Sequence, residues 1–341
     1  MKRKCLKSTL MGLGILFMMV MNIWAADDPI VWRFQVVHSP KQLEYDLFTK
    51  TVSDINAAAQ GRLKIELYPG GSFASSMESF QACGQGVFQV HSSWPIYLRG
   101  LEFAFQPMSG DNMAMSDTDR MIWLNEGGGN ELLQKGFDKV NLQLIATQMW
   151  PSDVLMANKP FQHISEMEGH KFRTSAPFIA EKQGIGAITL PLEEVFTAMA
   201  SGTVDMAEFG YLKYNEGLGI TDVVKYGIWP DFWNCHFVET IVVNKDAWNK
   251  LPEDLKKIVE LGFKAHALKH WTHTIYESAK VMNQLQENEK MEFIRMDTKD
   301  EFIKMRKQMY REEKKRSESK EGLTSACRRI QSAGNHPFVD V

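Results

Sequence analysis

The stretch from Lys171 to Phe209 constrains the fold of this chain more than any other part of the sequence. It begins with a short extended run, Lys171–Thr174, which contains Arg173 near its end. Apolar residues at helical spacing then predict a helix over Glu193–Met199, and Gly202 stands where a helix C-cap belongs. Val204–Phe209 has the composition of a buried strand. Strands that alternate with helices in this way are typical of α/β folds.

Two charged residues, Arg173 and Glu208, lie near the ends of these extended runs. Ligands of open α/β sheets bind beyond the carboxyl ends of the strands. The arginine fork binds a planar carboxylate through two parallel charge-assisted hydrogen bonds. A carboxylate next to the same anion requires a cation or a shared proton between them. We therefore expect Arg173 to bind a carboxylate, with a salt bridge at the surface or between lobes as its alternative. We expect Glu208 to meet a cation or the ligand, with a structural ion pair as its alternative.

The first 26 residues have the pattern of a secretory signal peptide. Positive residues precede the apolar core Leu10–Val20, and Ala25 and Ala26 offer small residues for cleavage. The apolar core is shorter than the ~20 residues that a membrane span needs, which disfavours the alternative of an uncleaved anchor. The sequence therefore predicts a periplasmic protein that is exported with a cleavable signal.

Cleavage would remove four of the 39 basic residues and leave 35 against 42 acidic ones. A net-acidic chain without a basic block is a poor candidate for binding nucleic acid. Cys83, Cys235 and Cys327 remain, and an odd number permits at most one bridge within the chain. A bridge between Cys83 and Cys235 is one interpretation, and free buried thiols are the favoured one.

The order of predicted elements indicates two lobes. Val31–Val37, a helix over Lys41–Gln60 and Leu63–Tyr68 form a β-α-β unit, which implies a parallel strand pair. The segment Gln148–Asp153 has the features of a crossing between domains, and a helical pattern follows Asp246. We predict a two-lobed periplasmic binding protein fold with a cleft between the lobes, long helices that cross them and a helical C-terminal region. The predicted division is signal peptide 1–26, lobe I 27–148 with about 239–275, lobe II 149–238, C-terminal helices 276–321 and a disordered tail 322–341.

A histidine pattern and a run of glycines are two further candidates for functional sites. His266, His270 and His273 have a helical spacing that could hold a transition metal, but the metalloprotease glutamate is missing. The sequence favours a solvent-facing histidine cluster. The glycines 127–129 are not followed by Gly-Lys-Ser/Thr, so a packed turn is favoured over a phosphate loop. The sequence also has no Gly-x-Ser-x-Gly elbow and no dinucleotide fingerprint, so no enzyme is predicted.

Several stretches together resemble the solute-binding proteins of tripartite ATP-independent periplasmic (TRAP) transporters. The most specific are Gly169–Thr174 and Glu194–Phe209, and Val243–Trp248 with Leu251-Pro252 support them. The resemblance covers roughly Trp32 to His270. It is strongest to the branch that binds 2-oxo and 2-hydroxy carboxylic acids.

This resemblance implies a set of site residues. Arg173 matches the carboxylate-clamping arginine, and Glu208 matches an acid that helps to hold a metal ion between protein and ligand. Glu239 matches a second acid, and Gln148 matches an amide ligand, although the following Trp-Pro-Ser-Asp departs from the usual glycine-rich run. Phe209 replaces the usual tryptophan but keeps the backbone carbonyl. Further candidates for ligand contact are Trp94, Tyr97, Phe209 and Asn215.

The function implied is capture of a small organic carboxylate, bridged by Na⁺ or Ca²⁺, and its delivery to the membrane permease subunits of a TRAP transporter. No cofactor is required for chemistry, and a homodimer through the C-terminal helices is permitted. Two alternatives remain open. The same site physics would suit a periplasmic protein that presents the solute to a sensor receptor. A metal-dependent periplasmic enzyme using Glu208 and the histidines is the third hypothesis.

Overall fold

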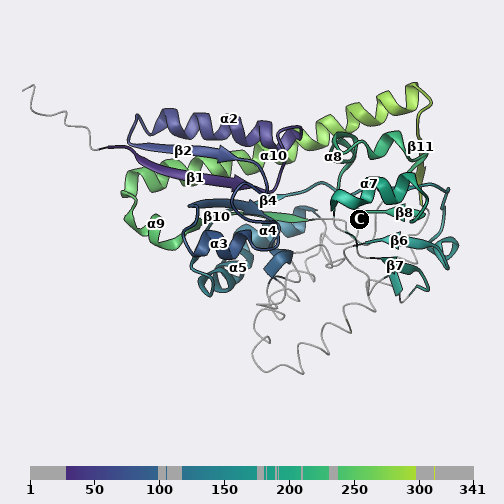
Figure 1. Cartoon of the computed structure of the whole chain (residues 1–341), viewed down its shortest axis with the longest axis horizontal. Helices are drawn as coiled ribbons and strands as arrows, with labels where there is room; N and C mark the ends of the chain where they lie inside the picture. Colours follow the sequence, from purple (N-terminus) through teal and green to yellow (C-terminus); the bar gives the residue numbers. More distant parts are fainter. Residues whose placement is uncertain are drawn as a thin grey trace, which may run out of the picture.

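Two β-sheets organise the computed structural model (Figure 1). It describes residues 28–98, 105, 117–174, 180–181, 183–188, 190, 192–208, 210–229, 237–296 and 311. The strand order is β2-β1-β3-β10-β4 in the first sheet and β11-β9-β5-β8-β6-β7 in the second. The two sheets lie side by side along the long axis of the molecule, as expected for two lobes (Figure 1).

The first sheet is built from β1 (Ile30–Val36), β2 (Leu63–Tyr68), β3 (Val90–Ser93), β4 (Leu142–Met149) and β10 (Val238–Asn244). Its neighbouring helices are α2 (Leu43–Ala58), α3 (Ser79–Gly84), α4 (Asp117–Glu126), α5 (Gly129–Asp138) and α9 (Lys245–Lys250). Strands β1 and β2 pair in parallel with α2 between them in sequence, which confirms the predicted β-α-β unit. A short 3-10 helix, η1 (Pro95–Leu98), follows β3.

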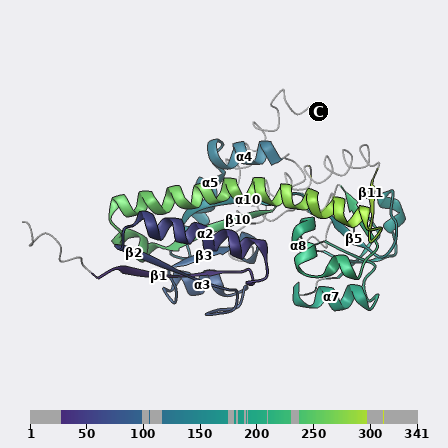
Figure 2. The ribbon, with the colours of Figure 1, turned by 90° about the horizontal axis from the view of Figure 1, so that it is seen from above.

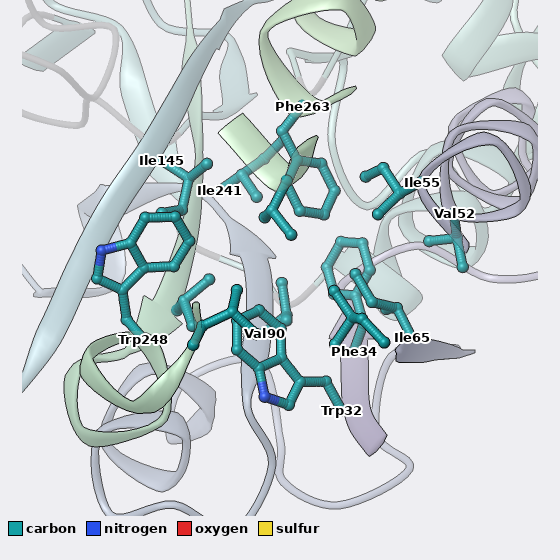
Figure 3. Close-up of a cluster of buried hydrophobic side chains, with 14 of the residues drawn as sticks. Trp32, Phe34, Val52, Ile55, Ile65, Val90, Ile145, Ile241, Trp248 and Phe263 are labelled. Carbon is teal, nitrogen blue, oxygen red and sulfur yellow. The ribbon is translucent and has the colours of Figure 1, made fainter. Parts of the chain in front are cut away.

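Apolar cores cover both faces of this sheet. One core joins the strands to α2 and to the long helix α10 (Glu253–Glu287), and Figure 3 shows Phe34 and Phe263 within it. Phe48 belongs to the same core. The Phe34 ring meets Phe48 edge-on at 5.2 Å and Phe263 at 5.6 Å. A second core packs α3, α4 and α5 against the sheet. With both faces covered, functional side chains of this sheet are confined to its strand ends.

The second sheet contains β5 (Leu155–Ala157), β6 (Lys171–Arg173), β7 (Gly186–Ile188), β8 (Met206–Ala207), β9 (Tyr226–Trp229) and β11 (Glu292–Arg295). Helices α7 (Leu192–Ala200) and α8 (Leu212–Gly217) and the 3-10 turns η3 (Ile164–Met167) and η4 (Ile220–Asp222) belong to the same part of the chain. The predicted helix is present as α7, and Gly202 has the positive φ of +70° that favours glycine after a helix. The predicted strand over Val204–Phe209 is shortened to β8.

Helix α10 runs along both sheets (Figure 2). It contacts β4 and α2 on the first sheet and α8 and β11 on the second. It approaches α2 closely, because a Cβ at Gly262 would lie 2.4 Å from Ile55 Cγ1. None of the described helices, α10 included, is long and apolar enough to cross a membrane. The helical pattern predicted for the range 276–321 allowed a break at 293–298, and the structure has β11 at about this place, where it extends the second sheet.

Candidate functional site

Arg173 lies at the end of β6, and main-chain carbonyls hold its guanidinium in place. Nε and Nη2 donate to the carbonyl of Leu190 at 3.3 and 3.2 Å, and Nη1 donates to the carbonyl of Glu208. The side chain is partly exposed. Burial lowers the pKa of the guanidinium, and the nearby Glu208 charge and Tyr97 oppose that shift. Arginine remains protonated at any physiological pH, so the end of β6 carries an oriented positive charge.

Glu208 follows β8 directly and is fully buried. Its side chain accepts a hydrogen bond of 2.6 Å from Thr174 Oγ1, and its N–H donates to the carbonyl of Arg173. Strands β6 and β8 are parallel, with Arg173 opposite Ala207, so both charged residues leave the sheet at the same edge. The structure thus brings together Arg173 and Glu208 as the sequence predicted.

Glu239 lies in β10 within a set of side chains that we call the Glu239 cluster: His38, Ser92, Gln148, Trp150 and Glu239. Ser92 Oγ donates to Oε1 at 2.6 Å. Gln148 Nε2 and Trp150 Nε1 donate to Oε2 at 2.7 and 2.9 Å. Burial opposes ionisation, but the His38 charge and the hydrogen bonds from His38 and Ser92 lower the pKa of Glu239 to about 2. The carboxylate is therefore ionised and surrounded by protein donors.

His38 supplies the opposite charge. Its Nε2 lies 3.1 Å from Glu239 Oε1. Burial lowers the pKa of His38, but the Glu239 and Glu44 charges outweigh it, so the pKa is raised overall. Both residues of this ion pair are completely shielded from solvent. The attraction within a buried pair of this kind is offset by the desolvation of both charges, so the intact pair adds little net stability, but removing one partner is strongly destabilising.

Three of the predicted ligand residues carry buried polar atoms that have no hydrogen-bond partner among the described residues: Trp94 Nε1, Gln148 Oε1 and Asn215 Oδ1. Gln148 Nε2 donates to Glu239, and this hydrogen bond orients the amide so that Oε1 is not used by Glu239. The amide of Asn215 is oriented in the same manner, because its Nδ2 donates to the carbonyl of Gly210 at 2.9 Å. Buried polar groups normally have partners, so such atoms mark places that a ligand, ion or water would satisfy.

Aromatic rings join these residues to both sheets. The Trp94 ring lies 6.2 Å from Tyr97 and 5.3 Å from Trp150, and Trp150 lies 5.1 Å from Tyr214, in α8. Tyr97 and Tyr214 are both close enough to Arg173 to influence the pKa of its guanidinium. The arginine therefore faces aromatic residues contributed by each part of the chain.

Phe209 lies outside the described residues, so its proposed carbonyl contact stays a prediction. Sequence reasoning missed His38 and Trp150 as members of the site. Each stands one or two residues beyond the end of a strand, β1 or β4. Trp94 was selected because it follows the carboxyl end of a strand, and the same criterion could have identified His38 and Trp150.

The prediction of a solvent-facing histidine cluster on α10 is wrong. His266 and His270 are buried, and only His273 is partly exposed. His266 Nδ1 bonds to Thr51 Oγ1 at 2.8 Å, and its ring stacks on Phe48 at 4.0 Å. Burial lowers the pKa of His266 to about 3 and that of His270 to about 4, so both are neutral. The described part of the chain contains no group of three or more His, Cys, Asp or Glu side chains that could hold a metal ion. The pattern failed because α10 buries this face against the first sheet.

Cys83, in α3, is a free thiol and is fully buried in the core, as the favoured interpretation predicted. Burial raises the pKa of this thiol well above its ordinary value. Cys235 and Cys327 lie outside the described residues.

Residues 34–316 match the family model described as bacterial extracellular solute-binding protein, family 7. The chain belongs to this family. The family and the two-lobed α/β fold of this family 7 protein are those of solute-binding proteins. Its resemblance to TRAP solute-binding proteins is thereby confirmed.

Curated relatives of this family 7 protein are distant. The monocarboxylate 2-oxoacid-binding periplasmic protein all3028 of Nostoc sp. is 23% identical over 233 residues, which cover 67% of this chain and 63% of that protein. A solute-binding protein of Albidiferax ferrireducens is 22% identical over 219 residues, or 61% of this chain and 62% of that protein. The chain thus spans somewhat less than two thirds of the length of these relatives.

Solved structures share the fold. The TRAP solute-binding protein of Colwellia psychrerythraea with bound calcium and pyruvate has a TM-score of 0.79 and 18% identity, with 90% of this chain and 94% of that chain covered. The protein of Bordetella bronchiseptica, a mixed-occupancy dimer with copurified calcium and picolinate, has a TM-score of 0.79 and 17% identity, covering 90% and 92%. The Pseudoalteromonas atlantica protein, with sodium and pyruvate, has a TM-score of 0.78, 18% identity and coverage of 90% and 94%.

Proposed function

We propose that this protein captures a small organic carboxylate, a 2-oxo or 2-hydroxy acid, outside the cytoplasm and delivers it to the permease of a TRAP transporter. The observation that carries the proposal is the position of Arg173. The residue is partly exposed, and the main-chain carbonyls of Leu190 and Glu208 fix its guanidinium at the end of β6. A fork held in this way loses little conformational entropy when it binds a carboxylate.

The remainder of the solute would contact polar and aromatic groups. Asn215 Oδ1 would accept from a ligand hydroxyl, and Trp94 Nε1 would donate to a ligand oxygen; both atoms otherwise stay unsatisfied among the described residues. Tyr97, near Arg173, would close over the bound acid, and Phe209 is kept as a further contact. Aromatic groups that exclude water strengthen the charge contacts.

A cation would fit beside the solute. Glu208 offers a buried carboxylate, and Gln148 Oε1 is a buried acceptor without a protein partner in the described chain. All-oxygen donor sets suit Na⁺ and Ca²⁺. Such an ion supplies a positive charge that offsets Glu208 and attracts the 2-oxo or 2-hydroxy oxygen. Phe209 and Glu239 remain predicted ligands. The contacts of Glu239 favour a supporting role, because it orients Gln148.

We also propose the cellular context and the division of the chain. Residues 1–26 would direct export to the periplasm. Residues 27–148 with about 239–275 would form lobe I, and 149–238 would form lobe II. Solute binding would favour the closed arrangement of the lobes, which the permease recognises. The protein would bind without turnover, and a homodimer would remain compatible with this role.

The test is ligand binding by the purified protein. Pyruvate and a panel of other 2-oxo and 2-hydroxy acids, each with Na⁺, Ca²⁺ or a chelator, should raise the melting temperature for at least one acid. The expected stabilisation is about 2.7 kcal/mol at a hundredfold excess of ligand over Kd. If no acid in the panel raises the melting temperature under any cation condition, the proposal fails.

Arg173→Lys is the sharpest variant, because it keeps the charge and removes the fork. We expect the Kd measured by calorimetry to rise by more than about 100-fold, in line with the loss of a buried charge-assisted contact. Arg62→Lys is the matched control. Arg62 is exposed and pairs with Asp254 at the surface, so its variant should bind like the parent. Unchanged affinity in Arg173→Lys would remove this residue from the site.

A further inference from the structure

Glu44 is a buried acid that the proposed solute contacts do not use. It lies in the first turn of α2. Tyr211, directly before α8, donates its hydroxyl to Glu44 Oε1, whereas Glu44 Oε2 has no hydrogen-bond partner among the described residues. Burial raises the pKa of this carboxyl group, and the His38 charge and the hydrogen bond from Tyr211 oppose that shift. A buried acid is costly to keep, so its contact with Tyr211 calls for an explanation.

The contact joins two helices that belong to different sheets. Helix α2 packs into the core of the first sheet through residues such as Phe48, whereas Leu212 of α8 packs in a core with Met156 of β5. A second contact lies on the same face of α8: burial and the Glu44 charge raise the pKa of Tyr214, and a hydrogen bond with Gln42 opposes this shift. We call these four residues the α2–α8 clasp: Gln42, Glu44, Tyr211 and Tyr214.

The clasp shares its two tyrosine rings with the candidate site. The Trp150 ring lies 5.3 Å from Tyr211 and 5.1 Å from Tyr214, distances at which aromatic rings are in contact. Trp150 Nε1 donates to Glu239 Oε2, the same atom that accepts from Gln148. A movement of α8 away from α2 would therefore disturb the packing of Trp150 and, through Glu239, the orientation of the Gln148 amide. The clasp and the solute contacts are thus mechanically linked.

We propose that Glu44 and Tyr211 are positioning residues for solute binding, because their hydrogen bond holds α8 against α2 in the arrangement that binds the solute. This inference rests on the proposed function, since it assigns both residues an effect on solute affinity without contact to the solute. A protein whose binding-competent arrangement is only partly populated binds with an affinity reduced by that fraction. Loss of a hydrogen bond to a buried carboxyl group should weaken that arrangement by about 10- to 100-fold in its equilibrium constant.

The first experiment measures how fast the purified full chain releases pyruvate in the presence of Ca²⁺, by stopped-flow fluorescence of its tryptophans. In Tyr211→Phe the off-rate should rise by more than about 10-fold, whereas the association rate should change little. A substitution that only destabilises the fold leaves the release rate of the folded molecules unchanged, so this measurement separates positioning from a merely structural role.

Two variants calibrate the measurement. Glu44→Gln is the conservative change: its amide oxygen still accepts from Tyr211, so its off-rate should stay within about threefold of the parent. Tyr276→Phe, at an exposed position on α10, is the matched control and should release pyruvate like the parent. An unchanged off-rate in Tyr211→Phe overturns the proposal, and so do equal effects of Tyr211→Phe and Glu44→Gln.

The second experiment needs no solute. Small-angle X-ray scattering of the ligand-free full chain should give Tyr211→Phe a larger radius of gyration than the parent, because molecules without the clasp open further. Glu44→Gln and Tyr276→Phe should scatter like the parent. Equal radii of gyration for Tyr211→Phe and the parent overturn the proposal. A parent that binds no acid of the panel contradicts the proposed function instead, and the scattering comparison then decides the role of the clasp on its own.

Discussion

The Glu239 cluster and the Arg173–Glu208 pair contain acids that look alike in the sequence and differ in their surroundings. Both glutamates are fully buried, and both were predicted to hold a cation. Glu239 accepts from four side chains, all of them in or next to strands of the first sheet. The contacts of Glu208 include a hydrogen bond from Thr174, and its main-chain carbonyl helps to fix Arg173. Burial and residue type alone therefore do not separate the two acids, whereas the surrounding donors do. On that ground we propose that Glu239 supports the site and that Glu208 meets the ligand.

The largest expected effect distinguishes the two acids by stability. Glu239→Gln leaves His38 buried without its counter-charge and sets an amide against donors, so the free energy of unfolding should fall by about 3–5 kcal/mol. Urea denaturation measures this. Glu208→Gln should cost less stability but should remove the dependence of ligand binding on Na⁺ or Ca²⁺. If the two variants lost the same stability and both kept the cation dependence of binding, the proposed difference between Glu239 and Glu208 would be wrong.

A second prediction concerns a contact between the two parts of the chain. Tyr211, directly before α8, donates its hydroxyl to Glu44 of α2, and both residues are buried. Tyr211→Phe removes a hydrogen bond to a buried carboxyl group, so the free energy of unfolding should fall by about 1.5–3 kcal/mol. Tyr276→Phe, at an exposed position on α10, is the control and should be close to neutral. A neutral Tyr211→Phe would show that the Glu44 contact contributes nothing to stability.

The smallest effect, counted per pH unit and per histidine, is a dependence of stability on pH that separates the buried histidines from Glu239. Because burial lowers the pKa of His266 to about 3, the folded state binds fewer protons than the unfolded chain below pH 6.5. This stabilising contribution is complete above pH 6.5 and is lost as the pH falls. Glu239, whose pKa is lowered to about 2, begins to lose its contribution only below about pH 4.5. Stability should therefore start to fall between pH 6.5 and 4.5, by on the order of 1 kcal/mol per unit for each buried histidine.

His266→Gln tests that assignment through the slope of stability against pH. The variant lacks the titrating group, so its stability should depend less on pH between 6.5 and 4.5, whatever its absolute value. Denaturant unfolding at several pH values supplies the slopes. Parallel curves for parent and variant would assign the acid sensitivity to other groups.

The sequence was sufficient for the parts of the fold that follow local rules. Helix α7 and the parallel unit of β1 and β2 have clear periodicity, and Arg173 and Glu208 were placed at one sheet edge because strand ends can be located from pattern. The histidines of α10 were misassigned, since spacing along a helix does not say which face the rest of the protein covers. His38 and Trp150 were overlooked because their roles depend on Glu239, which is distant in sequence. Strand β11 was missed because its four residues carry little strand pattern of their own, and its extended conformation depends on pairing with β9.

Helix α10 lies along both sheets as one continuous rod. A rod that is anchored at both ends restricts how the halves of a molecule can swing apart, because an opening movement must bend it or slide it over α8. The energy needed to bend this helix then contributes to the affinity for any molecule held between the halves. Substitutions on α10, far from Arg173, can therefore tune how readily cargo is released without touching the cargo.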